Sequence, residues 1–165
     1  MMAHAQDRSN PRLSDAFIQR VFSDDDAANY ELAVEAYRRM LQQVGAEPGL
    51  RKDREVLARH LQYVSLLLPE ATKREVGLPP EPGDVSPELV PSVDGETLLA
   101  WWRGQDRLPA TKVNEQLRAH LRRVAHAREH YAHPETPIGL DERGEVYIRL
   151  GPPDLRCRPA REGAE

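Results

Sequence analysis

Two histidines and a glutamate lie close together in the longest helical stretch that the sequence predicts. His126 and His130 are four residues apart, and Glu129 lies between them. Because positions i and i+4 share one face of a helix, both imidazoles could chelate a single Zn²⁺ while Glu129 acts as a general base. His133 follows directly and could supply a third nitrogen. These residue types at this spacing point to a small metal-dependent hydrolase.

The spacing His-x-x-Glu-His resembles the zinc-binding motif of the inverted zincins, but those are much larger proteins with a third, acidic ligand far downstream. Residues 126–130 also have an interpretation without metal. The apolar positions of the stretch are Leu117, Leu121 and Val124, and both histidines fall outside that stripe. We therefore favour a solvated helix face with no metal and no cofactor, and keep the hydrolase as the alternative.

Two tryptophans and two strand residues are the candidate binding residues. Trp101 and Trp102 are adjacent, and neighbours on a helix point about 100° apart. One of them is expected to anchor the core, and the other to cover the proline-rich linker before this helix or a partner. Tyr147 and Arg149 are expected on the outer face of a strand, where they could contact a partner.

The remaining polar residues favour structural roles. His60 and His120 lie beside apolar stripes and are expected to be hydrogen-bonded core or boundary residues. Asp141 and Asp154 bracket the predicted strand and are expected to terminate turns. Arginines form a locally basic face on the helix predicted over residues 112–131.

Composition limits the classes of function. The chain has 165 residues, 39% hydrophobic and 30% charged, with a formal net charge of -4. The negative charge and the lack of aromatics between the basic residues argue against nucleic-acid binding. One cysteine, Cys157, excludes an intrachain disulfide, and no apolar run is long enough to span a membrane.

Apolar spacings of three and four residues predict helices over residues 15–22, 27–44, 50–68, 95–102 and 112–131, with a further turn or two over 70–76. Prolines crowd residues 77–94 and predict a stiff linker that wraps over the surface or separates two helical units. We expect a disordered N-terminus (1–13), a helical hairpin unit (14–76), the linker (77–94), a second helical segment (95–154) and a disordered tail (155–165).

Residues 145–150 alternate between apolar and polar side chains. Val146, Ile148 and Leu150 share one face, and Gly151 with two prolines follows. This pattern predicts a short β-strand or hairpin at the C-terminal end of a mainly α helical hairpin bundle.

Two stretches resemble known families. Residues 29–44 resemble one helix of a tetratricopeptide repeat, in a single copy, which implies a helical hairpin and not a solenoid. Residues 96–154 resemble the GWxTD domain, an uncharacterised domain of some bacterial proteins, through the runs Leu98-Leu-Ala-Trp-Trp-Arg103, Leu108-Pro-Ala-Thr111, Ala127-Arg-Glu-His-Tyr131 and Gly151-Pro-Pro-Asp154. The naming motif is altered, since Leu140 stands where that family has tryptophan. The resemblance implies no activity, cofactor or catalytic residue.

These observations favour a non-enzymatic protein-interaction module, or a truncated domain. The unpaired strand edge predicts a protein partner or self-association through that edge. If Met1 is a misplaced start within a signal peptide, the protein is periplasmic or secreted; otherwise it is cytoplasmic.

Overall fold

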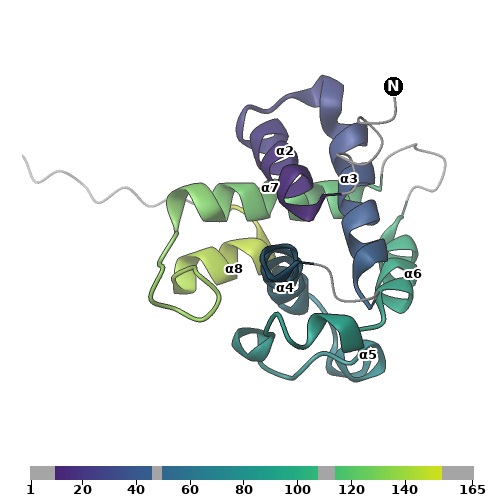
Figure 1. Cartoon of the computed structure of the whole chain (residues 1–165). Helices are drawn as coiled ribbons and strands as arrows, with labels where there is room; N and C mark the ends of the chain where they lie inside the picture. Colours follow the sequence, from purple (N-terminus) through teal and green to yellow (C-terminus); the bar gives the residue numbers. More distant parts are fainter. Residues whose placement is uncertain (1–9, 46–49, 108–113, 154–165) are drawn as a thin grey trace, which may run out of the picture.

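The structure, a computed structural model, describes residues 10–45, 50–107 and 114–153, and these residues are mainly helical (Figure 1). The mainly α fold class is confirmed. The elements follow one another in the order α2 (Pro11–Ser23), η1 (Ala27–Asn29), α3 (Tyr30–Gln43), α4 (Arg51–Ser65), α5 (Glu70–Val76), η2 (Pro82–Asp84), η3 (Val90–Ser92), α6 (Gly95–Gln105), α7 (Glu115–His130) and α8 (Glu142–Leu150), where η denotes a short 3-10 helix.

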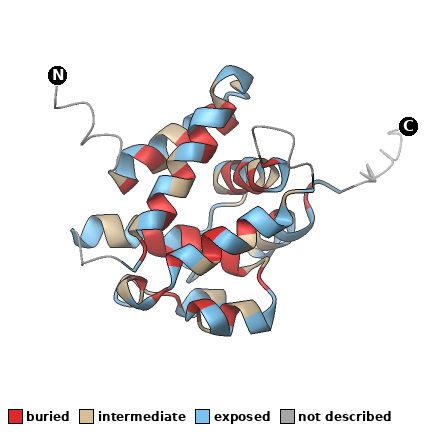
Figure 2. Ribbon diagram, turned by 90° about the vertical axis from the view of Figure 1, so that its right-hand side faces the viewer, coloured by how far each residue is buried: buried red, intermediate tan, exposed pale blue. Residues whose placement is uncertain are grey.

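The helices surround a main core and a smaller second cluster. α2 packs against α3, α4 and α7, while α3 also packs against α6 and α7 against α8. Each of these helices buries one stripe and leaves the opposite face to solvent, as the alternating colours of Figure 2 show. The second cluster lies between α4, α7, α8 and the loop before α8, and comprises Tyr63, Val124, Ala127, Ile138, Leu140 and Ile148.

Side-chain caps fix where several helices begin. The Asn10 side chain accepts a hydrogen bond from the Arg12 backbone N–H at 2.9 Å, and Pro11 takes the first helical position. α2 therefore starts at Pro11, inside the range predicted to be disordered, because proline at that position loses no helical hydrogen bond. Asn114 caps α7 in the same way. The preceding residues 108–113 lie outside the described part of the chain.

The proline-rich segment 77–94 lies against the helices. Leu78, Val85, Val90 and Val93 are each at most 5% exposed and belong to the main core. The Gln62 side chain on α4 donates to the Val85 carbonyl at 3.0 Å. The segment therefore contributes apolar side chains to the core while its prolines end any longer helix. The division of the chain into units stays a prediction.

The predicted C-terminal β-strand is wrong, because residues 142–150 form helix α8. The Asp141 side chain accepts from the Gly144 backbone N–H at 3.0 Å, which is an N-cap hydrogen bond. Gly151 follows the helix at φ +83°, a conformation that favours glycine. Of the three apolar residues that were expected to share a buried face, only Ile148 is buried; Val146 is 52% and Leu150 is 75% exposed.

This correction removes the basis for pairing through a strand edge. The described residues contain no strand, only an isolated bridge between Ala132 and Leu140. The expectation of a partner or a second copy at such an edge is therefore unsupported. A search of the described helices for one long and apolar enough to cross a bilayer finds none.

Candidate functional site

A cleft with a cavity volume of about 500 Å³ lies between α4, the proline-rich segment and the loop that connects α7 to α8. One face of α4 supplies polar side chains to it, namely Glu55, Arg59, Gln62 and Tyr63. The other walls are largely apolar and include Val85, Ile138 and Leu140. A volume of this size is within the usual range for sites that bind small molecules.

The loop wall of the cleft is held by its own hydrogen bonds. The backbone N–H of Asp141 donates to the Tyr131 carbonyl at 3.0 Å, and that of His133 donates to the Gly139 carbonyl at 2.9 Å. The Thr136 hydroxyl donates to the Leu140 carbonyl at 2.7 Å. Gln62 reaches across to the Pro137 carbonyl at 3.4 Å, so its amide links α4 to both other walls. The cleft is therefore braced on both sides.

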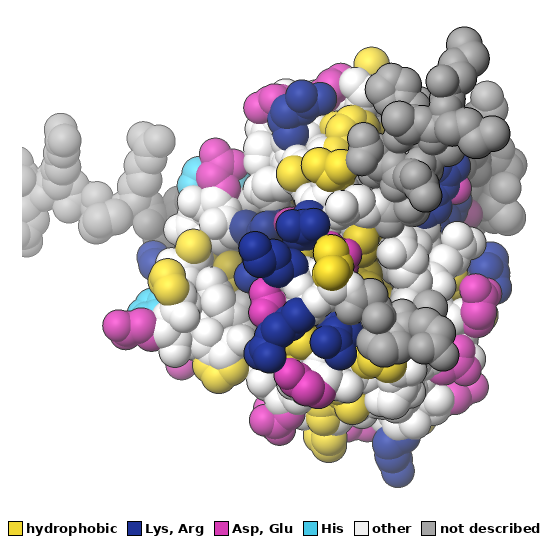
Figure 3. All heavy atoms as spheres, in the orientation of Figure 1, with side chains coloured by type: hydrophobic (Ala, Val, Ile, Leu, Met, Phe, Trp, Pro, Cys, Tyr) yellow, Lys and Arg dark blue, Asp and Glu magenta, His cyan; other side chains and the backbone are white. Residues whose placement is uncertain are grey.

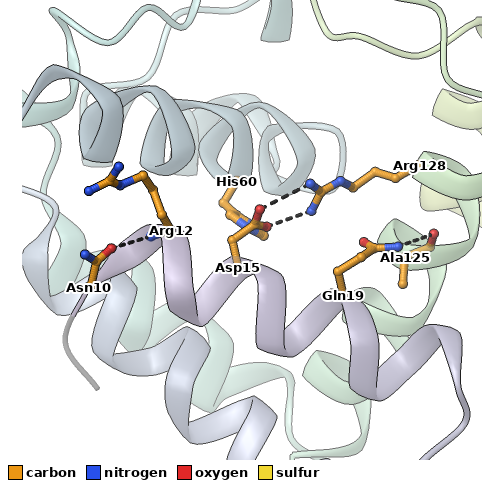
Figure 4. Close-up of polar contacts among 7 residues, drawn as sticks. All are labelled: Asn10, Arg12, Asp15, Gln19, His60, Ala125 and Arg128. Carbon is orange, nitrogen blue, oxygen red and sulfur yellow. Dashed lines mark hydrogen bonds and ion pairs between the residues drawn. The ribbon is translucent and has the colours of Figure 1, made fainter. Parts of the chain in front are cut away.

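Arg128 lines the cleft and is fixed from behind by Asp15. Its guanidinium donates to the two Asp15 carboxylate oxygens at 2.7 and 3.2 Å. The Asp15 carboxylate lies 2.7 Å from His60 Nε2. Figure 4 shows Asp15 on α2 between these two partners, which come from α7 and α4. One carboxylate thus joins three helices next to the cleft.

The ionisation of Asp15 follows from this setting. Burial on its own would raise the pKa of Asp15. The hydrogen bonds and charges of His60 and Arg128 outweigh burial and hold the pKa well below its usual range. Burial would lower the pKa of Arg128, but the hydrogen bond and charge of Asp15 raise it. Both groups are charged at neutral pH, so Arg128 and Asp15 form an ion pair at the edge of the cleft.

Two further donors in the cleft have no hydrogen-bond partner among the described residues. Arg59 is exposed, and its guanidinium makes no ion pair there. Tyr63 also lines the cleft and is 2% exposed, and its hydroxyl makes no hydrogen bond among the described residues. Burial raises the pKa of Tyr63, although the positive charges of Arg128 and Arg59 act to lower it. The hydroxyl is therefore protonated at neutral pH and can donate.

The surface around the cleft carries mixed charge. Figure 3 shows Lys and Arg side chains gathered on the face in front of α4, with acidic side chains among them. Arg51 pairs with Glu55 at 3.3 Å and with Glu88 at 3.8 Å. Arg51 is shared by two carboxylates, and Arg59 makes no ion pair among the described residues, so these four side chains together carry no net charge.

A second polar cluster is enclosed in the main core. The rings of Tyr37, His60, Trp102 and His120 contact one another at centroid distances of 5.2 to 6.4 Å. The Tyr37 hydroxyl, Trp102 Nε1, His60 Nδ1 and both His120 nitrogens are buried without a hydrogen bond of normal geometry in the described structure. Burial, followed by the charges of His60 and Arg123, lowers the pKa of His120 to about 3. His120 is therefore neutral at physiological pH.

The residues of the predicted zinc site are only partly brought together. His126 and His130 lie side by side, with ring centroids 4.3 Å apart. His126 also stacks on Tyr147 at 4.3 Å, and Glu129 is exposed. Among the residues that the structure describes, no group of three His, Cys, Asp or Glu side chains is placed to hold a metal ion. The pair belongs to an aromatic cluster between α7 and α8.

The predicted binding residues do not converge. Trp102 is 3% exposed and anchors the main core, while Trp101 is half-buried against it. Tyr147 and Arg149 lie on α8, which Figure 1 places on the opposite side of the molecule from α6. The Arg149 carbonyl accepts from Arg123 at 3.5 Å. None of the four residues lines the cleft.

Sequence reasoning missed the cleft residues. Arg59 and Tyr63 are four residues apart on α4, a spacing that places both on one helix face, and this signal was readable. The wall that faces them comes from residues 132–140, and Arg128 depends on Asp15, 113 positions away. Comparison of this chain with protein-family models, curated proteins and solved structures gives no match.

Proposed function

We propose that this protein is a non-enzymatic binding module whose ligand occupies the cleft between α4 and the loop before α8. The observation that supports the proposal is a braced cavity of about 500 Å³ that contains two unpaired donors, Arg59 and Tyr63. Arg59 is open to solvent at the cleft and Tyr63 is buried beside it, so both can donate hydrogen bonds to a ligand that supplies acceptors. The resemblance to the GWxTD domain stays a prediction.

The lining chemistry favours binding over catalysis. Nucleophilic or acid–base catalysis needs a reactive group next to a base or an acid with an adjusted pKa. Here the Thr136 hydroxyl donates to a carbonyl, Glu55 is paired with Arg51, and Asp15 is saturated by Arg128 and His60. Thr136 and Asp15 are therefore occupied within the fold, while Glu55 is in an exposed surface pair. The donors without a partner among the described cleft residues, Arg59 and Tyr63, can recognise a ligand without transforming it.

A fragment screen on the full chain tests this proposal. Amide signals of ¹⁵N-labelled protein would be recorded with a library of small fragments, and shifted signals mapped onto the fold. We expect hits to shift residues of α4 and of the 132–140 loop. In Ala132→Trp, an indole at an exposed cleft position should remove these hits. Ala100→Trp, exposed on α6, is the matched control and should keep them. Hits that map elsewhere, or that survive Ala132→Trp, would contradict the proposal.

A further inference from the structure

The geometry points to a carboxylate with an apolar body as the ligand of the cleft, bound through the Arg59 guanidinium and the Tyr63 hydroxyl. This inference rests on the proposed function and specifies the chemistry of that same site. The shared chemistry is that of an amphipathic organic acid or of a peptide C-terminus.

The two donors come from neighbouring turns of α4. Arg59 and Tyr63 are at i and i+4 on α4, so their side chains leave the same helix face. A guanidinium binds a carboxylate through parallel N–H donors, and a phenol adds a third donor to either oxygen. Arg128 uses two of its N–H groups on Asp15, which compensates its charge, so the Arg59 guanidinium is the open cationic donor of the cleft.

The remaining lining fits an apolar body. Ala58, Val85 and Ile138 line the cleft and are each at most 4% exposed. Pro87, Pro134 and Pro137 add rigid apolar surface. Displacing water from such surface favours an aliphatic or aromatic side chain next to the acid group.

The charge balance favours a monoanion over a phosphate. Glu55 lies one turn before Arg59 on the same helix face, and the whole chain has a formal net charge of -4. A dianion would be repelled by this carboxylate and would need more donors than the cleft offers. A cation is disfavoured by the Arg59 guanidinium, which makes no ion pair among the described residues.

Matched probes test the inference by titration of ¹⁵N-labelled full-length protein. The probes are N-acetyl-L-leucine, its neutral analogue N-acetyl-L-leucinamide, inorganic phosphate, and the peptide acetyl-Ala-Pro-Leu with a free C-terminus. We expect saturable shifts of cleft residues with the two carboxylates at millimolar concentration, and none with the amide or phosphate. Tighter binding of the peptide than of N-acetyl-leucine would identify a peptide terminus as the source of the acid; the reverse would identify a small organic acid.

Variants locate the contact. Arg59→Gln should weaken carboxylate binding about tenfold, and Tyr63→Phe about fivefold, which are typical effects of a charged and a neutral hydrogen bond. Arg20→Gln, an exposed arginine on α2 without an ion pair in the described residues, should bind like the parent. Thermal unfolding of Arg59→Gln should be unchanged, because Arg59 has no partner to lose.

Failure of the inference differs from failure of the proposed function. If the amide shifts cleft residues as strongly as the acid, or if Arg59→Gln binds the acid equally well, the carboxylate assignment is wrong but the cleft still binds ligands. If phosphate binds tighter than either carboxylate, the ligand class is wrong. If none of the probes and none of the fragments shifts cleft residues, both proposals are wrong.

Discussion

Replacing Asp15 by Asn should destabilise the fold strongly. The carboxylate is the common acceptor for Arg128 and His60, with the shortest contacts at 2.7 Å. The side chains of Asp15 and Arg128 are 14% and 21% exposed, and that of His60 is 2% exposed. Breaking a buried ion pair by removing one partner costs about 3–5 kcal/mol. Because Arg128 retains some solvent contact, we expect the lower end, about 3 kcal/mol.

The measurement is equilibrium unfolding in urea at pH 7, followed by tryptophan fluorescence. With a slope of roughly 2 kcal/mol per molar urea, the midpoint should fall by about 1.5 M. Asp84→Asn, at an exposed position in η2, is the matched control and should leave the midpoint unchanged. A loss smaller than about 1 kcal/mol for Asp15→Asn would refute the role of Asp15 as a joint between α2, α4 and α7.

The pH dependence provides an independent check on the same residue. The pKa of Asp15 is lower in the folded than in the unfolded state, so its stabilisation is complete above the unfolded value near 4. It should be lost as the pH falls below that value. The stability of Asp15→Asn should therefore depend less steeply on pH in the acid range than that of the parent. Equal acid slopes would contradict the assignment.

Three further predictions concern the core and the helix ends. Because the pKa of His120 falls from 6.5 to about 3 on folding, the free energy of unfolding should drop by roughly 2 kcal/mol between pH 6.5 and 5, and His120→Leu should lose that part of the pH dependence in urea titrations. Asn114→Ala should cost roughly 2–3 kcal/mol in the same assay because it removes the α7 cap and the donor to the Trp102 carbonyl. Asn114→Asp keeps the cap but sets a buried carboxylate oxygen against that carbonyl, so it should destabilise as well. Gly95→Ala should destabilise by about 1–3 kcal/mol in thermal unfolding, since its Cβ would collide with the Leu41 carbonyl. Gly104→Ala, with open space around it in the same helix, should stabilise by about 0.5–1 kcal/mol, and equal signs for the two variants would contradict one of these assignments.

Helical periodicity predicted most of the fold. In α7, the spacing of Leu117, Leu121 and Val124 indicated the buried stripe, and all three are at most 3% exposed. α5 also appears over the residues where a further turn or two was expected. Such predictions succeed because an amphipathic stripe records which face a helix buries, whatever it packs against.

The C-terminal helix was mispredicted because a short stretch carried two patterns. Three apolar residues at alternate positions suggested a strand, but six residues are too few for the period to decide. The flanks contained the stronger signal: Asp141 as an N-cap, Glu142 and Glu145 in the first turn, Arg149 in the last turn, and Gly151 after it. These capping residues favour a helix. The alternating pattern predicted one buried face with three apolar side chains, but only Ile148 is buried, while Val146 and Leu150 are exposed.

The candidate site could be predicted only in part. The spacing of Arg59 and Tyr63 follows from the helix that holds them. Their facing wall and the contact between Asp15 and Arg128 depend on tertiary packing that a single sequence does not encode locally. The metal hypothesis had the correct local geometry, since His126 and His130 are neighbours, but a site needs ligands from other elements, and sequence spacing does not supply their position.

A crystal structure of the full chain soaked with a fragment library tests the central claim most directly. We predict fragment density between α4 and the 132–140 loop, with an acceptor atom of the fragment within hydrogen-bond distance of the Arg59 guanidinium or the Tyr63 hydroxyl. Fragments that bind only elsewhere, or a cleft that stays empty while other surfaces are occupied, would contradict a binding function for this cleft.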